Sequence, residues 1–301
     1  MSSLNRMNTR ILPTSFNYYE PRTIDEALKL LSELSPEVRI LAGGTDLIVK
    51  MKARQVEPKN IINIKRIEGL RYITEEKGKI KIGALATWRD LEKSWQISKK
   101  IPALFDAISV MGSVQVRSMA TIAGNLCNAS PAADSAPPLL VHGAIVKASS
   151  IRGTREIPLD KFFLSPGKTI LMPDEIVVEI EVPVPPQRSS SAFLKLSRTA
   201  MDLAKASAAA YLEVEDGKVV DAKIALGAVA PRPVRSLSAE AELIGKPATE
   251  ETFSLASRQV VKDISPIDDI RSTASYRKKV SPILVEDALK LAFSRIRGEL
   301  G

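Results

Sequence analysis

One short segment restricts what this chain can fold into. In it, an apolar run is followed by two adjacent glycines and then by a helical stretch. Residues 38–41 form the apolar run and predict a strand, whereas residues 47–54 predict a helix. Between them stand Ala42, Gly43, Gly44, Thr45 and Asp46. Glycines let a backbone approach a ligand closely and adopt positive φ, and a helix start offers free N–H groups that suit a pyrophosphate. The segment therefore predicts mixed α and β structure, with a turn that either binds phosphate or is a simple tight turn.

Two side chains of this turn add further possibilities. Thr45 offers a hydroxyl donor. Asp46 is placed to cap the helix, although its charge opposes a phosphate beside it.

A second segment, residues 119–134, is rich in small residues and short polar side chains. Four of its polar side chains can hydrogen-bond a ligand, and they are Thr121, Asn125, Ser130 and Asp134. Gly124 and the alanines keep the backbone accessible. We expect a loop over residues 121–135, which either contacts a ligand or packs on a helix.

The remaining pattern predicts strands and helices on both sides of a linker. Further strands are expected at residues 60–64, 79–83 and 176–182. Helices are expected from a capping box at residues 23–26, from Thr87 to about residue 94, and at residues 101–110. The linker is predicted by Pro183, Pro185, Pro186 and the serines at 189–191.

Beyond the linker, the pattern predicts a hairpin followed by helices. Residues 206–214 and 219–229 flank the acidic-glycine sequence of residues 215–218, which is typical of a turn between two strands. Helices are then expected near residues 239–244, 250–261 and 280–296.

Composition excludes several kinds of site. The chain of 301 residues has one cysteine, Cys127, and one histidine, His142. One cysteine cannot form an internal disulfide, and neither count supports a metal or iron–sulfur site, since such sites need clustered ligands. Any catalytic pair with histidine would have to use His142, which sits in an apolar stretch and is otherwise a packed histidine.

Charge and hydropathy point to an ordinary cytoplasmic protein. The net charge is +8, but the basic residues are mixed with acidic ones, as in residues 66–81, so solvated faces explain them better than nucleic-acid binding does. No apolar run approaches the roughly 18–20 residues that span a bilayer. Residues 1–10 lack the apolar stretch of a secretory signal.

The common nucleotide motifs are absent. No G-x-G-x-x-G occurs, so a nicotinamide-type Rossmann site is not supported. Gly167-Lys168-Thr169 matches the end of a P-loop, but Phe162 stands where its first glycine would be.

Taken together, the two segments resemble the FAD-binding subunit, or middle domain, of the xanthine dehydrogenase and carbon monoxide dehydrogenase family. The first flavin motif is similar to residues 42–47, followed by Met51-Lys52. The second is similar to residues 120–125, followed by Ala129-Ser130-Pro131 and Asp134. The similarity continues through Phe162-Phe163 to Ser275-Tyr276-Arg277, and so spans nearly the whole chain.

The resemblance implies a mixed α+β fold. We expect a two-lobed FAD-binding domain of the PCMH type over residues 1–183, with lobes of about 1–62 and 63–183. A C-terminal domain of the CO dehydrogenase flavoprotein type, with a small antiparallel sheet, is expected over residues 187–301.

The resemblance also implies cofactor contacts. The FAD pyrophosphate would be wrapped by Ile40, Leu41, Ala42, Gly43, Gly44, Thr45, Asp46 and Leu47. The second side of the dinucleotide would be held by Ala120, Thr121, Gly124 and Asn125. Asp134 would hydrogen-bond near the ribityl chain, and Lys195 would lie near the isoalloxazine. Leu171, or its neighbour Ile170, would pack on a cofactor ring, and Met111 stands where relatives can carry an aromatic contact.

Partners follow from the same resemblance. The molybdenum cofactor would belong to a large subunit and two [2Fe-2S] clusters to a small one, in a doubled heterotrimer. This chain would pass electrons through FAD to an external acceptor, as one subunit of an oxidoreductase, with no catalytic side chain of its own. The subtype with an extra cluster in the flavin subunit is excluded, since Cys127 alone cannot hold one.

Other functions compete with this interpretation. A self-contained flavin oxidase of the vanillyl-alcohol oxidase superfamily would need its own substrate domain and catalytic groups. A cell-wall reductase acting on UDP-N-acetylmuramate-type substrates shares the fold. The hypothesis of a nucleic-acid-binding protein would rest on the net positive charge alone.

Overall fold

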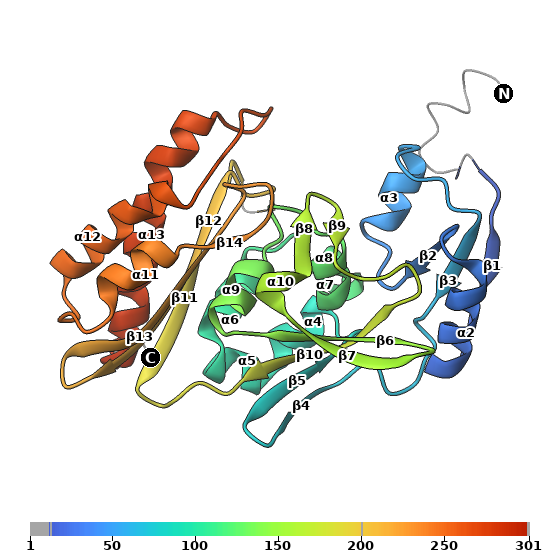
Figure 1. Ribbon diagram of the computed structural model, residues 1–301, viewed down its shortest axis with the longest axis horizontal. Coiled ribbons are helices and arrows are strands. Elements are labelled where there is room, and N and C mark those ends of the chain that lie inside the picture. Colours follow the sequence, from blue (N-terminus) through green and yellow to red (C-terminus); the bar gives the residue numbers. More distant parts are fainter. Residues whose placement is uncertain (1–11, 13, 200, 300–301) are drawn as a thin grey trace.

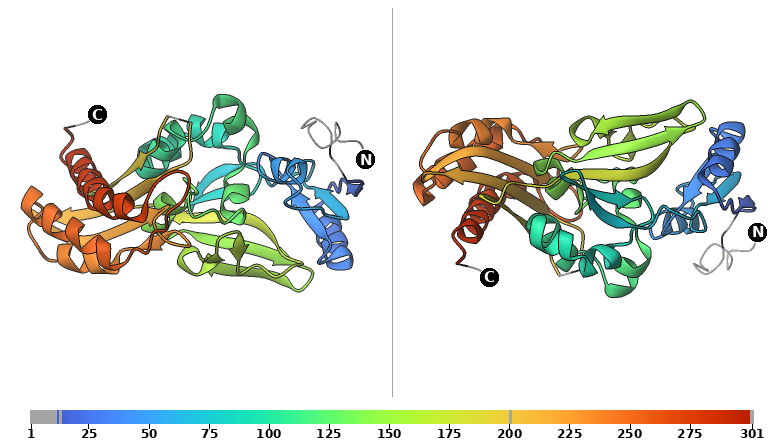
Figure 2. Two further views of the ribbon diagram at one scale, coloured as in Figure 1. Left: turned by 90° about the horizontal axis from the view of Figure 1, so that it is seen from above. Right: turned by 90° about the horizontal axis from the view of Figure 1, so that it is seen from below.

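Three sheets follow one another along the long axis of the molecule (Figure 1). The structure is a computed structural model that describes residue 12, residues 14–199 and residues 201–299. The predicted polar N-terminus, residues 1–10, lies outside the described residues. Views from above and below place the first parallel sheet and the C-terminal helices at opposite ends (Figure 2).

The first lobe is built on a small parallel sheet. Its strands, in the order β1-β3-β2, are β1 (Asn17–Tyr19), β3 (Asn60–Asn63) and β2 (Val38–Leu41). Helix α2 (Ile24–Leu34) packs Ala27, Leu28 and Leu31 into the core of this lobe. Helix α3 (Leu47–Lys52) follows the glycine turn at the end of β2, as the sequence predicts.

The predicted capping box of α2 forms only in part. Thr23 Oγ1 accepts from the backbone N–H of Glu26 at 3.2 Å. The Glu26 carboxylate, however, accepts from the backbone N–H of Arg22, one residue before the cap. At the next predicted cap, Thr87 and Asp90 form the complete box.

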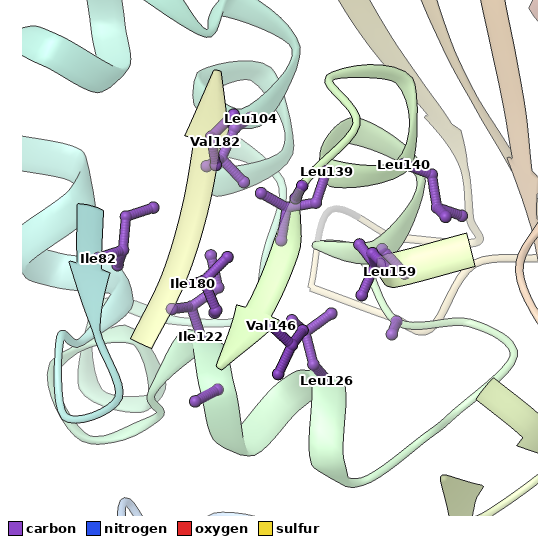
Figure 3. Close-up of a cluster of buried hydrophobic side chains, with 14 of the residues drawn as sticks. Ile82, Leu104, Ile122, Leu126, Leu139, Leu140, Val146, Leu159, Ile180 and Val182 are labelled. Carbon is purple, nitrogen blue, oxygen red and sulfur yellow. The ribbon is translucent and has the colours of Figure 1, made fainter. Parts of the chain in front are cut away.

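The second lobe is an antiparallel sheet covered by helices on one face. Its strands, in spatial order, are β4 (Ile73–Glu76), β5 (Lys79–Gly83), β10 (Ile176–Pro183), β6 (Ile145–Ser150) and β7 (Gly153–Pro158). The helices that contribute to its core are α4 (Trp88–Lys93), α5 (Trp95–Lys100), α6 (Pro102–Ser109), α8 (Ile122–Cys127), α9 (Ala136–Val141) and α10 (Leu159–Phe162). Figure 3 shows part of this core. Helix α7 (Val114–Met119) and the hairpin of β8 (Phe163–Ser165) and β9 (Lys168–Thr169) complete the lobe.

The loop predicted over residues 121–135 is wrong in its first half, because α8 lies there. Ile122 and Leu126, four residues apart, both enter the core in Figure 3. Gly124 and Asn125 are poor helix formers in the middle of this short segment, so the packing of Ile122 and Leu126 in the core favours the helix over a loop.

The C-terminal domain is an antiparallel sheet with helices against it. The strands are β11 (Ser189–Leu196), β12 (Ala206–Glu215), β13 (Lys218–Gly227) and β14 (Val234–Arg235). The helical segments are α11 (Leu237–Leu243), α12 (Glu250–Gln259), η1 (Val260–Lys262) and α13 (Ala274–Ile296). The predicted hairpin is β12–β13, and Asp216 and Gly217 turn it with φ of 50° and 75°.

Strand β12 is buried on both faces. Ala209 and Tyr211 belong to the core of the second lobe, whereas Ala208, Ala210 and Leu212 belong to the core of the C-terminal domain. Small residues on both faces let helices approach from either side. This explains why β12 is a run of apolar residues without alternation.

Two predicted boundaries are corrected. The serines at 189–191 are part of β11, so the linker between β10 and β11 is residues 184–188. Helix α13 begins at Ala274, before the predicted 280, because Thr273 caps it by accepting from Tyr276 N at 3.3 Å. Pro282 lies inside the helix.

The predicted α+β fold with a small antiparallel C-terminal sheet is confirmed, since the parallel sheet has only the strands β1, β2 and β3 among the described residues. In the same part of the chain, none of the helices has the length and apolar character that crossing a membrane requires.

His142 is a packed residue at the end of α9. Its side chain is buried, its Nε2 lies 2.9 Å from Ser191 Oγ, and its ring meets Tyr211 edge to face. Burial, helped by the charge of Lys223, lowers the pKa of His142 to about 3. The imidazole is therefore neutral at neutral pH.

We predict that the free energy of unfolding falls as the pH drops from about 6.5 towards about 3. Over that window His142 gains a proton in the unfolded chain but not in the folded one, which costs up to about 1.4 kcal/mol per pH unit. His142→Gln cannot titrate and should flatten this slope in urea denaturation at a series of pH values. Above pH 7.5 wild type and variant should show equal slopes. An unchanged acid slope in the variant would assign the titration to another group.

Candidate functional site

The two glycine-bearing segments meet backbone to backbone. A Cβ on Gly43 would lie 2.1 Å from the carbonyl oxygen of Met119 and 2.9 Å from the Cα of Ala120. No side chain fits in that space without moving the backbone. Gly43 therefore lets the turn after β2 rest on the junction of α7 and α8.

Gly44 has a different requirement. Its φ is +81°, in the left-handed region that glycine adopts without strain. Its carbonyl oxygen then accepts from Ile48 N at 3.0 Å, which begins α3. The turn thus combines a close approach at Gly43 with a special backbone conformation at Gly44.

Asn128 bridges the two segments, a role that the sequence pattern does not predict. Its Nδ2 donates to Asp46 Oδ1 at 3.1 Å, and its Oδ1 accepts from Lys50 Nζ. Asp46 occupies the N-cap position of α3 but makes no side-chain capping bond, so the predicted cap is wrong. Burial raises the pKa of Asp46, against the opposing effect of Lys50. No local pattern marks Asn128, because its partners lie about 80 residues away.

The second segment begins with a capped helix. Thr121 is the N-cap of α8, and its Oγ1 accepts from Gly124 N at 3.1 Å. A Cβ on Gly124 would lie 2.8 Å from that oxygen. Ala120 is tied to the second lobe through its carbonyl, which accepts from Trp88 N at 3.0 Å. Asn125 Oδ1 accepts from Ser135 Oγ at 2.6 Å, which connects α8 to the residue after Asp134.

A buried ion pair lies beyond α8. Lys195 Nζ, on β11, is 2.9 Å from Asp134 Oδ2, and both side chains are nearly excluded from solvent. The ammonium also donates to Val110 O at 3.2 Å. Burial raises the pKa of Asp134, and Lys195 opposes that rise. The other oxygen, Oδ1, is buried and has no hydrogen-bond partner among the described residues.

The other predicted contacts surround these two centres. Ile40 and Ala42 pack on the core of the first lobe, and Leu41 and Leu47 share a small cluster with Met51. Met111 follows Val110 and is half-buried against the core of the second lobe.

Leu171 and Ile170 pack on the same core as Met111. They follow β9, and the β8–β9 hairpin reaches the second segment where Gly167 N donates to Ala129 O at 2.9 Å. The structure therefore joins residues 42–47 to residues 119–128, and joins Asp134, Lys195 and the segment of Met111 in a second cluster.

Known families match almost the whole chain. A family described as "FAD binding domain in molybdopterin dehydrogenase" matches residues 14–185. A second, "CO dehydrogenase flavoprotein C-terminal domain", matches residues 191–292. The chain belongs to the FAD-binding medium subunits of the xanthine dehydrogenase and carbon monoxide dehydrogenase family.

Individual relatives agree with this membership. The carbon monoxide dehydrogenase medium chain of Hydrogenophaga pseudoflava is 33% identical over 95% of this chain and 99% of its own. The xanthine dehydrogenase FAD-binding subunit of Escherichia coli O157:H7 is 31% identical over 94% of this chain and 98% of its own. A solved structure of carbon monoxide dehydrogenase from H. pseudoflava superimposes with a TM-score of 0.92 at 34% identity, over 95% of this chain and 99% of that one.

The residues present fit the FAD that this family implies. Gly43 and Gly44 leave two adjacent positions of the turn without side chains, beside the start of α8. The buried Oδ1 of Asp134 is a hydrogen-bond acceptor without a donor among the described residues, and a hydroxyl group of the cofactor could donate to it. Both features occur at positions that the sequence motifs predict.

The alternative functions are not favoured in this family. Its full-length relatives are medium or FAD-binding subunits rather than complete oxidases. His142 is buried and neutral, bonded to Ser191, and is therefore poorly placed to act as a base.

We predict that Gly43→Ala harms the protein more than Gly44→Ala does. In Gly44→Ala the strained φ should cost about 1–2 kcal/mol of the free energy of unfolding. In Gly43→Ala the Cβ meets the Met119 backbone, so the two segments must separate and FAD affinity should fall further. Urea denaturation and FAD titration measure both effects. Equal stability and FAD affinity in wild type and Gly43→Ala would show that the close contact is dispensable.

Proposed function

We propose that this chain is the FAD-carrying electron-transfer subunit of a heteromeric molybdenum hydroxylase, and so one subunit of an oxidoreductase. Electrons would arrive from the [2Fe-2S] clusters of a partner and leave to an external acceptor. Family membership over nearly the whole chain supports the class of enzyme. The single structural observation that carries the proposal is the buried Asp134 carboxylate, paired with Lys195 and with one oxygen unpartnered within the described residues.

The two segments would share the dinucleotide. Residues 40–47 would hold the diphosphate, because Gly43 and Gly44 leave the backbone N–H groups of the turn accessible to an anion. Thr121, Gly124 and Asn125, with Ala120, would hold the second side. The contact between Gly43 and Met119 supports this, since it fixes the two segments at one separation.

The ion pair would face the flavin part of the cofactor. Asp134 would accept from a ribityl hydroxyl through Oδ1 while Oδ2 keeps Lys195 in place. The Lys195 ammonium, near the ring, would stabilise the negative charge that reduction adds. The chemistry that FAD supplies when bound is reversible electron transfer. Leu171 and Met111 would give the ring an apolar, water-excluding surface.

The proposed assembly is a large molybdenum-cofactor subunit, this medium subunit and a small iron–sulfur subunit, each present twice. The similarity to medium chains supports separate large and small chains. This chain has a single cysteine, whereas [2Fe-2S] clusters need several cysteine ligands each, so those ligands belong to another chain.

We propose the domain boundaries 1–183 and 187–301, with lobes of about 1–62 and 63–183. The end of the parallel sheet at Asn63 and the linker of residues 184–188 support them. The cytoplasmic location expected from the sequence stays a prediction.

The proposed assembly predicts what purification from the source cell should yield. Native mass spectrometry should find this chain with a large and a small partner, and denaturation of the complex should release FAD. The large partner should contain molybdenum and the small one iron. A stable homo-oligomer without partners that oxidises a substrate by itself would instead support the self-contained oxidase.

We predict that Asp134→Asn weakens FAD binding by roughly tenfold to a hundredfold, since a hydrogen bond to a charged acceptor contributes about 1.5–3 kcal/mol. The variant keeps the size of the side chain but removes the charge that Lys195 faces. Asp216→Asn, in the exposed β12–β13 turn, is the matched control and should bind FAD like wild type. Fluorescence titration of flavin-depleted complex measures both. Wild-type affinity in Asp134→Asn would remove this carboxylate from the cofactor site.

A further inference from the structure

The C-terminal helix is bound to the second lobe by a two-pronged ion pair. Arg295, in the last turn of α13, places its two terminal nitrogens 2.8 Å from the two carboxylate oxygens of Asp106 on α6. One of these nitrogens also donates to Ser191 O on β11 at 2.7 Å. Both side chains are only about a fifth exposed, at 22% and 20%. One guanidinium therefore holds three elements together.

The same carboxylate fixes β11 against α6. Asp106 Oδ2 accepts from Phe193 N at 3.0 Å, and Ser191 Oγ accepts from Ala103 N at 3.1 Å. Ser191, Phe193 and Lys195 alternate along the strand and so point to one face. That face looks into the second lobe, where Phe193 enters the core.

The third residue on this face is Lys195. It is two positions beyond Phe193, and its ammonium reaches Val110 O, directly after α6, and Asp134 Oδ2. Both ends of α6 thus contact β11. If β11 shifted relative to α6 at the contact between Phe193 and Asp106, Lys195 would be displaced as well. Arg295 itself touches neither Lys195 nor Asp134 in any bond of the described residues.

We propose that Arg295 is a positioning residue for the cofactor site. It holds Asp106 in the orientation that accepts from Phe193 N, and the strand then delivers Lys195 to Asp134. This rests on the proposed function, because it takes Lys195 to lie near the flavin. The C-terminal domain is then part of the machinery that sets FAD affinity and flavin potential.

Arginine suits this role for a physical reason. Its planar guanidinium binds both oxygens of a carboxylate at once and so fixes the carboxylate's rotation. Lysine would keep the charge but hold one point only. Without Arg295, the bond to Phe193 N would be the only one of these contacts left to the Asp106 carboxylate, which could then rotate away from that N–H and loosen β11 at its contact with α6.

The test measures the dissociation constant of FAD and the midpoint potential of the flavin in the assembled complex. Four proteins are compared: wild type, Arg295→Met, Lys195→Met and the double variant. Lys195→Met should lower the potential and weaken FAD binding. Arg295→Met should shift both in the same direction, with binding weakened roughly twofold to a hundredfold. The double variant should match Lys195→Met alone, since Arg295 acts through Lys195. Retained partner subunits on size-exclusion chromatography show that the assembly is intact.

Matched variants separate positioning from stability. Arg297→Met removes the exposed arginine two residues further on, which pairs with Glu299, and should leave both quantities unchanged. Arg295→Lys and Asp106→Asn keep part of the contact and should give intermediate shifts. If Arg295→Met does not assemble with the partner subunits, these two variants are used to test the proposal instead.

Four outcomes would overturn the inference, and they are distinguishable. Additive shifts in the double variant would show that Arg295 acts by another route. In a second outcome, Lys195→Met changes FAD affinity and flavin potential, but Arg295→Met or the two milder variants keep the wild-type values. This would support the cofactor site and show that Arg295 does not position it. Unchanged values in Lys195→Met would remove Lys195 from the site, and the inference with it. A wild-type complex without FAD would refute the proposed function itself.

Discussion

The burial of β12 on both faces is the constraint on which the rest of the structure depends. Ala209 and Tyr211 face the helices of the second lobe, and Ala208 and Ala210 face the helices of the C-terminal domain. A strand without a solvent face joins two cores into one continuous body, because separating them would expose apolar surface on the strand. The neighbouring strand β11 pairs with β12 and so also lies between the two cores. Lys195 on β11 can therefore reach Asp134 in the other domain.

The proposed site follows from two kinds of backbone requirement. Gly43 is needed because the first segment lies against the carbonyl of Met119, and Gly44 because the turn needs positive φ. Around this rigid contact, polar groups are almost all satisfied internally: Thr121 caps α8, Asn125 binds Ser135 and Asn128 binds Asp46. Asp134 Oδ1 differs from these, and an unpartnered buried carboxylate oxygen is costly unless a ligand supplies a donor.

Local pattern predicted what depends on local chemistry. The strand and helix on either side of Gly43-Gly44, the Thr87–Asp90 cap and the β12–β13 hairpin all formed as expected, because each depends on neighbours within a few residues. Helix α8 was not predicted, because Gly124 and Asn125 are poor helix formers, and the packing of Ile122 and Leu126 in the core favours the helix together with the cap at Thr121. The entry of Ser189–Ser191 into β11 depends likewise on pairing with β12, 20 or more residues away, whereas the early start of α13 follows from the local cap at Thr273.

The sequence by itself determined the family, the fold class and the position of the two glycine-bearing segments, because glycines, caps and turn residues act where they stand in the chain. Tertiary structure alone decided which residues meet. The contact of Gly43 with Met119, the bridge of Asn128 to Lys50 and Asp46, and the Asp134–Lys195 pair each join residues more than 60 positions apart. The physical reason is that a side chain's charge and burial depend on neighbours that only the folded chain brings near it, and no pattern within one segment encodes them.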